Sequence, residues 1–503
     1  MPKFERLSGW DYATWFSASE DPVMRSTMIG CLVLQESPDW ERLVDRYDRA
    51  SRVVPILRQR LVEGPVGIAN PRLVVDPNFD LSFHLRRFLM PEGSTWQDVL
   101  DECSRQGMTD FDRDRPLWKV TLLEGLPGGR AALISKLHHA IADGQGAMQL
   151  GAALVDITPE GFDLGPIPPA PEGLELSPRH FAEIMVQDNT EWIINTAKNA
   201  VKNAVPNLVS FLTAPQESIE QVAETVSSLV RMANTPTSPL SPVMTKRSIN
   251  YHFGNFDVRF RDLRDAAKAN GHTINDAFLA GVSLGMAEYH KREGEPVDEL
   301  HINMPISLRV AGDGAQNAVT IARFNLPTNE TNVDTLMDIL GKTVKRMRAE
   351  PAMEYTNQLG EISRFIPKEL LTAAAQASDV TASNVPGPPI DVYLAGAKVE
   401  AMVPLPPPIG AAVFVALLTY HGTAAIGVAM DDAAVTNREL LMECLRYGFA
   451  QVTGKPVSAD NPLTGKKAAG KKAAAKKAPA KKAPAKKAPA KKAATKKAAA
   501  KKA

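Results

Sequence analysis

RAALISKLHHAIADGQGAMQLGAALVD, residues 130–156, contains a strand pattern, a histidine pair and a helix pattern in succession. Its first part is an apolar run typical of a buried strand, and its last part has apolar residues at helical spacing. His138 and His139 lie where the strand pattern stops, and Asp143 and Gly144 form a turn ahead of the helix. This succession of a strand, a turn and a helix predicts an α/β domain.

The two histidines are expected to differ in role, because adjacent side chains on an extended segment point to opposite sides. Only one of them then faces a cleft at the end of the strand. The same geometry disfavours a metal site, since two strand neighbours cannot readily close on one ion and the chain has no H-E-x-x-H spacing. A lone strand histidine is more often a core residue, but H-H-x-x-x-D-G arises by chance in about one in 10³ such chains.

Length and composition indicate two domains and an intracellular setting. The 503 residues, 44% of them hydrophobic, exceed what one small core needs. The charged N-terminus does not match a signal peptide, and no apolar run approaches the ~20 residues that span a bilayer. Cys31, Cys103 and Cys444 show no C-x-x-C spacing, which argues against disulfide and zinc frameworks. We therefore expect a cytoplasmic protein with reduced thiols and no transmembrane helix.

The net charge of +1 hides two opposite parts. Residues 465–503 hold 16 lysines and no acid, whereas the remainder has 42 basic and 57 acidic residues, a net charge of −15. Lysine pairs alternate with alanine, and Pro479, Pro484 and Pro489 interrupt any helix, so this tail is expected to be disordered when alone. An acidic body and a basic tail should attract different partners.

Two proline-rich connectors, 165–178 and 234–242, divide the rest of the chain. We expect a first domain over residues 1–178, a helical crossover and linker over 179–242, a second domain over 243–455, and the tail over 456–503. Apolar residues at helical spacing between 193 and 208 indicate an amphipathic helix. A crossover helix packed on the core is the favoured interpretation, and a helix on a lipid surface is the alternative.

Two further patterns in the second domain predict structure. Residues 412–420 and 424–430 form apolar runs joined around His421 and Gly422, which predicts a hairpin. Gly281, Ser283 and Gly285 match G-x-S-x-G, but the neighbouring apolar residues share a helical face, which argues against a hydrolase nucleophile. A G-x-x-x-x-G-K match in the tail lacks the Ser or Thr and the preceding strand of a nucleotide site.

Beyond HHAIADG, nearly the whole chain before the tail resembles the bacterial wax ester synthase/diacylglycerol acyltransferase family. The similarity lies in motifs that follow one another in the family's order. These are LSGWDYATWF (7–16), FDLSFHLRR (79–87, an early strand in the family), PLW (116–118), ND (275–276), PISLR (305–309) and SNVPGPP (383–389).

The resemblance implies a two-domain α/β fold shared with coenzyme A-dependent acetyltransferases and peptide-synthetase condensation domains, with a substrate tunnel between the domains. It implies that His139 is the general base, that Asp143 has a structural role, and that acyl-CoA is a co-substrate with no bound cofactor. His138 is expected to be structural. Residues of the matched motifs are candidates for substrate binding: Gly144, Pro116, Leu117, Trp118, Asp276, Arg309, Ser383 and Asn384. For the PLW element, packing is the favoured role.

The implied reaction is transfer of a long-chain acyl group to diacylglycerol, a long-chain alcohol or both. A neutral imidazole suits deprotonation of an alcohol near physiological pH, so no covalent acyl-enzyme is needed. We expect Arg309 to pair with Asp143. Asn275 is a candidate oxyanion donor, although Thr273, Asn275 and Asp276 equally fit the capped start of a helix through Tyr289.

The tail suggests further partners. Evenly spaced lysines without aromatic residues predict salt-sensitive, sequence-independent binding to nucleic acid, or to an anionic membrane or lipid-droplet surface. A merely solubilising end is the third interpretation. Two alternatives to the main function stay open: acyl transfer to another lipid or polyketide hydroxyl, and a non-catalytic lipid- or DNA-binding protein.

Overall fold

The computed structural model describes residues 5–7, 9–63, 71–142, 144–173, 236–307, 319–350, 368–459 and 461–464. The amphipathic segment 193–208 and the lysine-rich tail lie outside these residues. The expected start of the tail at residue 456 stays a prediction. Residues up to 465 belong to one compact unit, and Leu463, which is 4% exposed, packs into a hydrophobic cluster of that unit.

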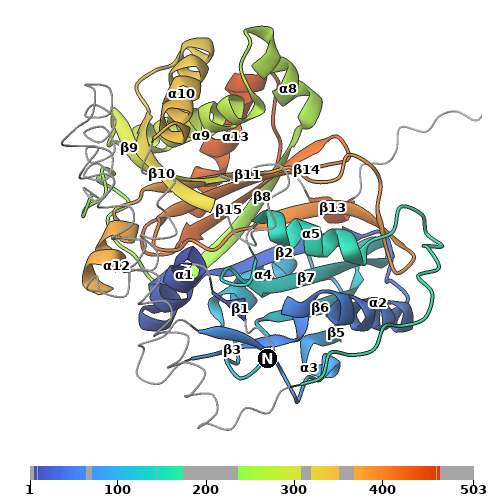
Figure 1. Ribbon diagram of the computed structural model, residues 1–503. Coiled ribbons are helices and arrows are strands. Elements are labelled where there is room, and N and C mark those ends of the chain that lie inside the picture. Colours follow the sequence, from blue (N-terminus) through green and yellow to red (C-terminus); the bar gives the residue numbers. More distant parts are fainter. Residues whose placement is uncertain are drawn as a thin grey trace, which may run out of the picture. The chain divides into compact units, whose positions relative to one another are not determined.

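The first six-stranded sheet has the strand order β12-β13-β2-β7-β6-β5. Its strands β2, β7, β6 and β5 come from the first half of the chain (Figure 1). The apolar residues 28–34 lie in β2, and Asp39 caps the following helix α2 by accepting the Arg42 N–H. A small sheet, β1-β4-β3, completes this half. The elements are β1 (Glu5–Arg6), α1 (Gly9–Glu20), β2 (Thr27–Leu34), α2 (Trp40–Val53), β3 (Gln59–Val62), β4 (Arg72–Val75), α3 (Leu81–His84), β5 (Leu85–Leu89), α4 (Trp96–Met108), β6 (Trp118–Leu126), β7 (Arg130–His138) and α5 (Gly144–Leu154).

One expectation for this half is wrong in part. Residues 79–87 were expected to form a strand, but they begin with the short helix α3 and continue as β5. Asp80 accepts both the backbone N–H and the hydroxyl of Ser82, at 2.9 and 2.8 Å. This local capping starts a helical turn before the chain can extend.

The second half builds another six-stranded sheet, ordered β10-β9-β11-β14-β15-β8. Figure 1 shows α8, α9, α10 and α13 on one side of this sheet and the first half of the chain on the other. The predicted hairpin is β14–β15, whose turn residues His421 and Gly422 have positive φ of 39° and 84°. The elements are β8 (Tyr251–Arg259), α8 (Phe260–Ala269), α9 (Ile274–Arg292), β9 (Glu299–Ser307), β10 (Val319–Pro327), α10 (Val333–Arg348), α12 (Lys368–Gln376), β11 (Val380–Val385), β12 (Tyr393–Leu394), β13 (Ala397–Leu405), β14 (Val413–Tyr420), β15 (Thr423–Asp431) and α13 (Arg438–Thr453).

The two sheets do not follow the order of the chain. Strands β12 and β13 come from the second half, yet β13 pairs antiparallel with β2 of the first sheet. The first sheet therefore contains strands from both sides of the predicted boundary near residue 243. In crossing over, β13 passes so close to β15 that a Cβ on Gly427 would overlap the carbonyl of Pro404.

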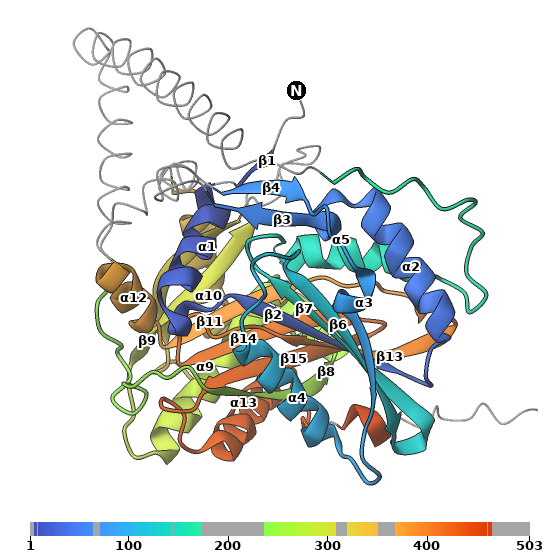
Figure 2. The same ribbon diagram turned by 90° about the horizontal axis from the view of Figure 1, so that it is seen from below.

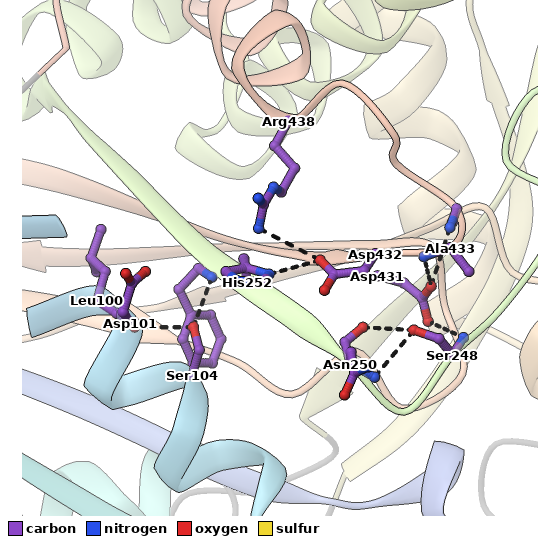
Figure 3. Close-up of polar contacts among 12 residues, drawn as sticks. Leu100, Asp101, Ser104, Ser248, Asn250, His252, Asp431, Asp432, Ala433 and Arg438 are labelled. Carbon is purple, nitrogen blue, oxygen red and sulfur yellow. Dashed lines mark hydrogen bonds and ion pairs between the residues drawn. The ribbon is translucent and has the colours of Figure 1, made fainter. Parts of the chain in front are cut away.

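Helix α4 covers the edge strand β8 and so joins the two halves. The Ser104 hydroxyl accepts the backbone N–H of Phe253 at 3.2 Å, and Trp96 Nε1 donates to the Asn255 side chain at 2.6 Å. Figure 3 shows Ser104 beside the start of β8, next to the ion pair of His252 with Asp432. An edge strand covered in this way cannot pair with another chain.

Four arginines of α2, spaced three or four residues apart, hold the connector that follows α5. Arg42 and Arg46 pair with Asp156, which is 1% exposed, and Arg49 and Arg52 donate to backbone carbonyls between residues 164 and 168. Asp156 also exchanges two backbone hydrogen bonds of 2.8 Å with Tyr393 of β12. Asp156, two residues after α5, is thereby tied to α2 of the first half and to β12 of the second. Figure 2 shows α5 beside α2.

The G-x-S-x-G match is a helix crossing. Gly281 and Gly285 share the face of α9 that meets α13, and a Cβ on Gly448 would collide with the backbone of both. Ser283 lies within α9, is 0% exposed and donates its hydroxyl to the carbonyl of Pro327. This serine has neither the turn nor the exposure of a hydrolase nucleophile, as the helical pattern predicted.

Candidate active site

Strand β7 ends at the histidine pair. His138 lies opposite Thr27 of β2, and the backbone N–H of His139 donates to the Ser26 carbonyl at 2.8 Å. The N–H of Ile141 then bonds back to the His138 carbonyl at 3.1 Å. The strand therefore stops in a tight turn that leads into α5.

His138 is a core residue. Its side chain is 3% exposed and lies between two aromatic rings, Trp15 at 5.3 Å and Phe111 at 5.9 Å between centroids, both in edge-on geometry. Its Nδ1 accepts the N–H of Ala140 at 3.1 Å, so the neutral ring carries its proton on Nε2. Burial lowers the pKa of His138 to about 3, with a further lowering from His139 beside it. A ring with so low a pKa is too weak a base for an alcohol at neutral pH.

His139 differs from its neighbour in exposure. It is half-buried, and the alternation of side chains along β7 directs it to the face opposite His138. Ala140 and Ile141, which follow it, belong to the same hydrophobic cluster as Leu418 and Tyr420 of β14. The turn after the histidines therefore lies where strands of the second half approach the first.

A buried lysine near the histidines was not singled out in the sequence. Lys136 is 4% exposed, and its Nζ donates to the carbonyls of Thr109 and Asp110 at 2.7 and 3.3 Å. The same Nζ lies 4.4 Å from the centroid of the Phe111 ring. Its position two residues before His138, on the same strand face, is the signal that could have identified it.

The glycine-proline loop after β11 packs against the end of β14. Gly387 donates its N–H to the Thr419 hydroxyl at 3.0 Å, and a Cβ at Gly387 would collide with the Thr419 carbonyl. Ser383 and Asn384 pair in register with Ala416 and Leu417 of β14 and are half-buried. Their roles in substrate binding stay predictions.

Trp118 and Leu117 are packed in the core, with 2% and 0% of their side chains exposed. Trp118 Nε1 donates to the Leu57 carbonyl at 2.8 Å, and its ring stacks on His84 at 4.4 Å. His84 itself is 0% exposed, and its Nδ1 lies 2.7 Å from the Trp118 carbonyl. This geometry supports the packing role of the Pro116–Trp118 element rather than contact with substrate.

The ND pair starts helix α9. Asp276 accepts the Thr273 N–H at 2.8 Å, while the Thr273 hydroxyl accepts the Asp276 N–H at 3.2 Å, which is a complete capping box. The carboxylate of Asp276 also packs closely against Gly341 of α10, where an added Cβ would lie 3.2 Å from it. These contacts give Asp276 a structural role. Asn275, half-buried in the first turn, keeps its role as oxyanion donor only as a prediction.

Two predicted partners, Asp143 and Arg309, lie outside the described residues, so their ion pair stays a prediction. Gly144 begins α5. Within the described ranges, no group of three or more His, Cys, Asp or Glu side chains could hold a metal ion, and no helix is long and apolar enough to cross a membrane. The three cysteines are free and buried, and Cys31 and Cys103, 72 positions apart in the sequence, belong to one hydrophobic cluster.

Comparison with known proteins identifies the family. The profile of the wax ester synthase/diacylglycerol acyltransferase catalytic domain matches residues 7–278, and that of the family's C-terminal domain matches residues 315–453. The chain belongs to the wax ester synthase/diacylglycerol acyltransferase family. It is an enzyme of the diacylglycerol O-acyltransferase/wax ester synthase type.

Relatives in this family span most of the chain. A protein of Mycobacterium tuberculosis named as a diacylglycerol O-acyltransferase is 33% identical over 436 residues, which cover 86% of this chain and 88% of that protein. A second protein of that organism, named diacylglycerol O-acyltransferase tgs1, is 26% identical over 459 residues, covering 88% and 94%.

Solved structures confirm the expected fold. The wax ester synthase/diacylglycerol acyltransferase of Marinobacter aquaeolei VT8 matches with a TM-score of 0.58 at 20% identity, covering 90% of this chain and 100% of that one. The first condensation domain of the calcium-dependent antibiotic synthetase matches with a TM-score of 0.59 at 14% identity, covering 92% and 98%. At these identities the likeness concerns the fold alone, and it agrees with the condensation-domain-like α/β architecture expected from the sequence.

Proposed function

We propose that this acyltransferase moves a long-chain acyl group from acyl-CoA to the hydroxyl of diacylglycerol, of a long-chain alcohol, or of both. His139 acts as the general base, and no covalent acyl-enzyme forms. The observation that carries the proposal is the contrast between the two histidines. His138 is buried, with a pKa lowered to about 3 and its Nδ1 occupied by Ala140, whereas His139 is half-buried at the end of the strand.

The chemistry needs one group that first accepts a proton and then returns it. The imidazole of His139 takes the hydroxyl proton as the alcohol oxygen attacks the thioester carbonyl. The tetrahedral intermediate then breaks its C–S bond, and the imidazolium gives the proton to the departing CoA sulfur. The products are an oxygen ester and free CoA, so the mechanism requires neither a Ser nor a Cys nucleophile.

Other residues complete the proposed site. Asn275 is the candidate side chain for stabilising the oxyanion, a contribution of roughly 3 kcal/mol in well-studied sites. Asp143 fixes the loop after the histidines, with Arg309 as its partner. The alternative acceptor is another lipid or polyketide hydroxyl, which the same general base would activate.

The test measures CoA thiol released from palmitoyl-CoA with dioleoylglycerol or hexadecanol as acceptor. His139→Ala should abolish release that depends on the acceptor while the protein keeps its melting temperature. The matched control is His272→Ala, because His272 pairs with Asp334 between α8 and α10 and is outside the proposed machinery. Undiminished release in His139→Ala would refute the proposed base, and no release from the native chain with any acceptor would favour the non-catalytic binding alternative.

The basic tail is proposed to hold the enzyme at an anionic lipid surface, of a membrane or a lipid droplet. Its 16 lysines contribute attraction that an acidic body of net charge −15 lacks. A surface of that kind is where an oily acceptor and ester product would gather. Truncation before Lys466 should abolish sedimentation with phosphatidylglycerol vesicles at low salt and leave acyl transfer to dispersed acceptor intact. If the native protein is retained on DNA but not on vesicles, nucleic acid is the favoured partner of the tail. If it is retained on neither, the tail serves only to keep the protein soluble.

A further inference from the structure

The contacts of Lys136 carry an inference beyond the motif residues. Its ammonium group reaches the segment that follows α4, where Thr109 is the helix C-cap. Arg25 reaches the same helix end, donating from Nη1 to the Met108 carbonyl at 2.7 Å. The last carbonyls of a helix carry partial negative charge, so two cations are favourably placed there.

The segment that Lys136 holds also positions Phe111. This ring is 8% exposed and lies between the Lys136 ammonium group and the His138 imidazole. Trp15 packs on His138 as well, and the guanidinium of Arg113 lies 5.0 Å from the Trp15 ring centroid. His138 is thus held by two aromatic rings, each in contact with a cation.

Burial of the Lys136 ammonium group and the cations around it oppose this attraction to the helix end. Burial lowers the pKa of Lys136 to about 8, Lys119 and Arg25 lower it further, and Asp110 opposes them. Lys119 lies directly across from Lys136 in the β6–β7 register, and like charges in such pairs are unfavourable. A buried ammonium group whose pKa is lowered destabilises the folded state at neutral pH, so the fold alone does not explain it.

We infer that Lys136 is a positioning residue for the histidine pair, acting through the 109–111 segment and the Phe111 ring on His138. With His138 fixed, its Nδ1 holds the Ala140 N–H and sets the turn that carries His139. The inference rests on the proposed role of His139 as the base. Small displacements of a catalytic group lower turnover without changing the groups that bind substrate.

The experiment compares Lys136→Met with Lys119→Met, measuring kcat, KM for palmitoyl-CoA and melting temperature. Lys136→Met should lower kcat about 10- to 100-fold with KM within about twofold. Its melting temperature should change little, because removal of the buried charge offsets the loss of the hydrogen bonds to the Thr109 and Asp110 carbonyls. Lys119→Met removes a neighbouring cation without touching the 109–111 segment and should keep kcat.

Three outcomes would overturn the inference: an unchanged kcat in Lys136→Met, an equal fall in Lys119→Met, or a melting temperature that falls in step with kcat. Phe111→Leu is the second variant if Lys136→Met does not fold. It removes the ring that contacts His138 and should lower kcat similarly, and native turnover in it would also overturn the inference. His139→Ala, measured alongside, distinguishes failure of the Lys136 inference from failure of the proposed function. Undiminished turnover in His139→Ala would refute the proposed base itself.

Discussion

Gly427 of β15 lies directly against the carbonyl of Pro404 in β13, with no space for a side chain between them. This is the point where the strand contributed to the first sheet crosses the second sheet. Gly427→Ala should therefore force the two strands apart and lower the free energy of unfolding by about 1–3 kcal/mol. Urea unfolding measures this, with Gly30→Ala as the control, because Gly30 is also a strand glycine but has nothing within 4 Å of an added Cβ. Equal stability of the two variants would contradict the close crossing.

The crossing of α9 and α13 predicts a second glycine effect. A Cβ on Gly448 would meet the Gly281 carbonyl and the backbone of Gly285, so Gly448→Ala should separate the helices and destabilise the protein by about 1–3 kcal/mol. Gly151 of α5 has open space around it, and Gly151→Ala should instead be neutral or stabilising by up to about 1 kcal/mol. Thermal unfolding of both variants tests the assignment, which fails if Gly448→Ala unfolds at the native temperature.

The acceptor role of His138 can be separated from its packing. In His138→Asn the side-chain oxygen can replace Nδ1 as the acceptor for Ala140, whereas His138→Ala leaves that N–H without its partner. We expect His138→Asn to keep substantially more activity than His138→Ala in CoA-release assays. Because the pKa of His138 is about 3, the acidic limb of the pH profile of kcat/KM near neutrality should stay unchanged in His138→Asn. A shift of that limb would mean that His138 is itself the titrating base.

The buried histidines also predict how stability depends on pH. Burial lowers the pKa of His84 to about 4, with a smaller lowering from Lys119 and Arg115, whereas an unfolded histidine titrates near 6.5. Below pH 6.5 the unfolded state binds a proton that the folded state does not, so stability is complete above 6.5 and is lost as pH falls toward 4. As the pH falls from 6.5 to 5, His84 alone should lower the free energy of unfolding by about 2 kcal/mol.

His84→Phe tests this linkage, because it keeps an aromatic ring beside Trp118 and removes the titrating group. The dependence of the unfolding free energy on pH between 5 and 6.5 should become shallower by about one proton. The same slope in variant and native protein would show that His84 is not the source of acid sensitivity. His138 should add a similar slope of its own, which persists in the variant.

Local sequence patterns predict individual helices and turns and the histidine pair at the end of β7. The Thr273–Asp276 capping box and the His421–Gly422 turn each depend on residues only a few positions apart, so their patterns predict α9 and the β14–β15 hairpin. The family motifs likewise identify the histidine pair, because the motif is contiguous.

Contacts between residues distant in the chain could not be predicted from local sequence patterns. The transfer of β13 to the first sheet, the meeting of Gly427 with Pro404, and the burial of Lys136 against the end of α4 follow from how the sheets pack. The glycines of the G-x-S-x-G match allow α9 to cross α13 closely, which only the packing of α13 reveals. The physical reason is that local patterns report which side of an element is apolar, while the partner of that side is chosen by the packing of the whole core.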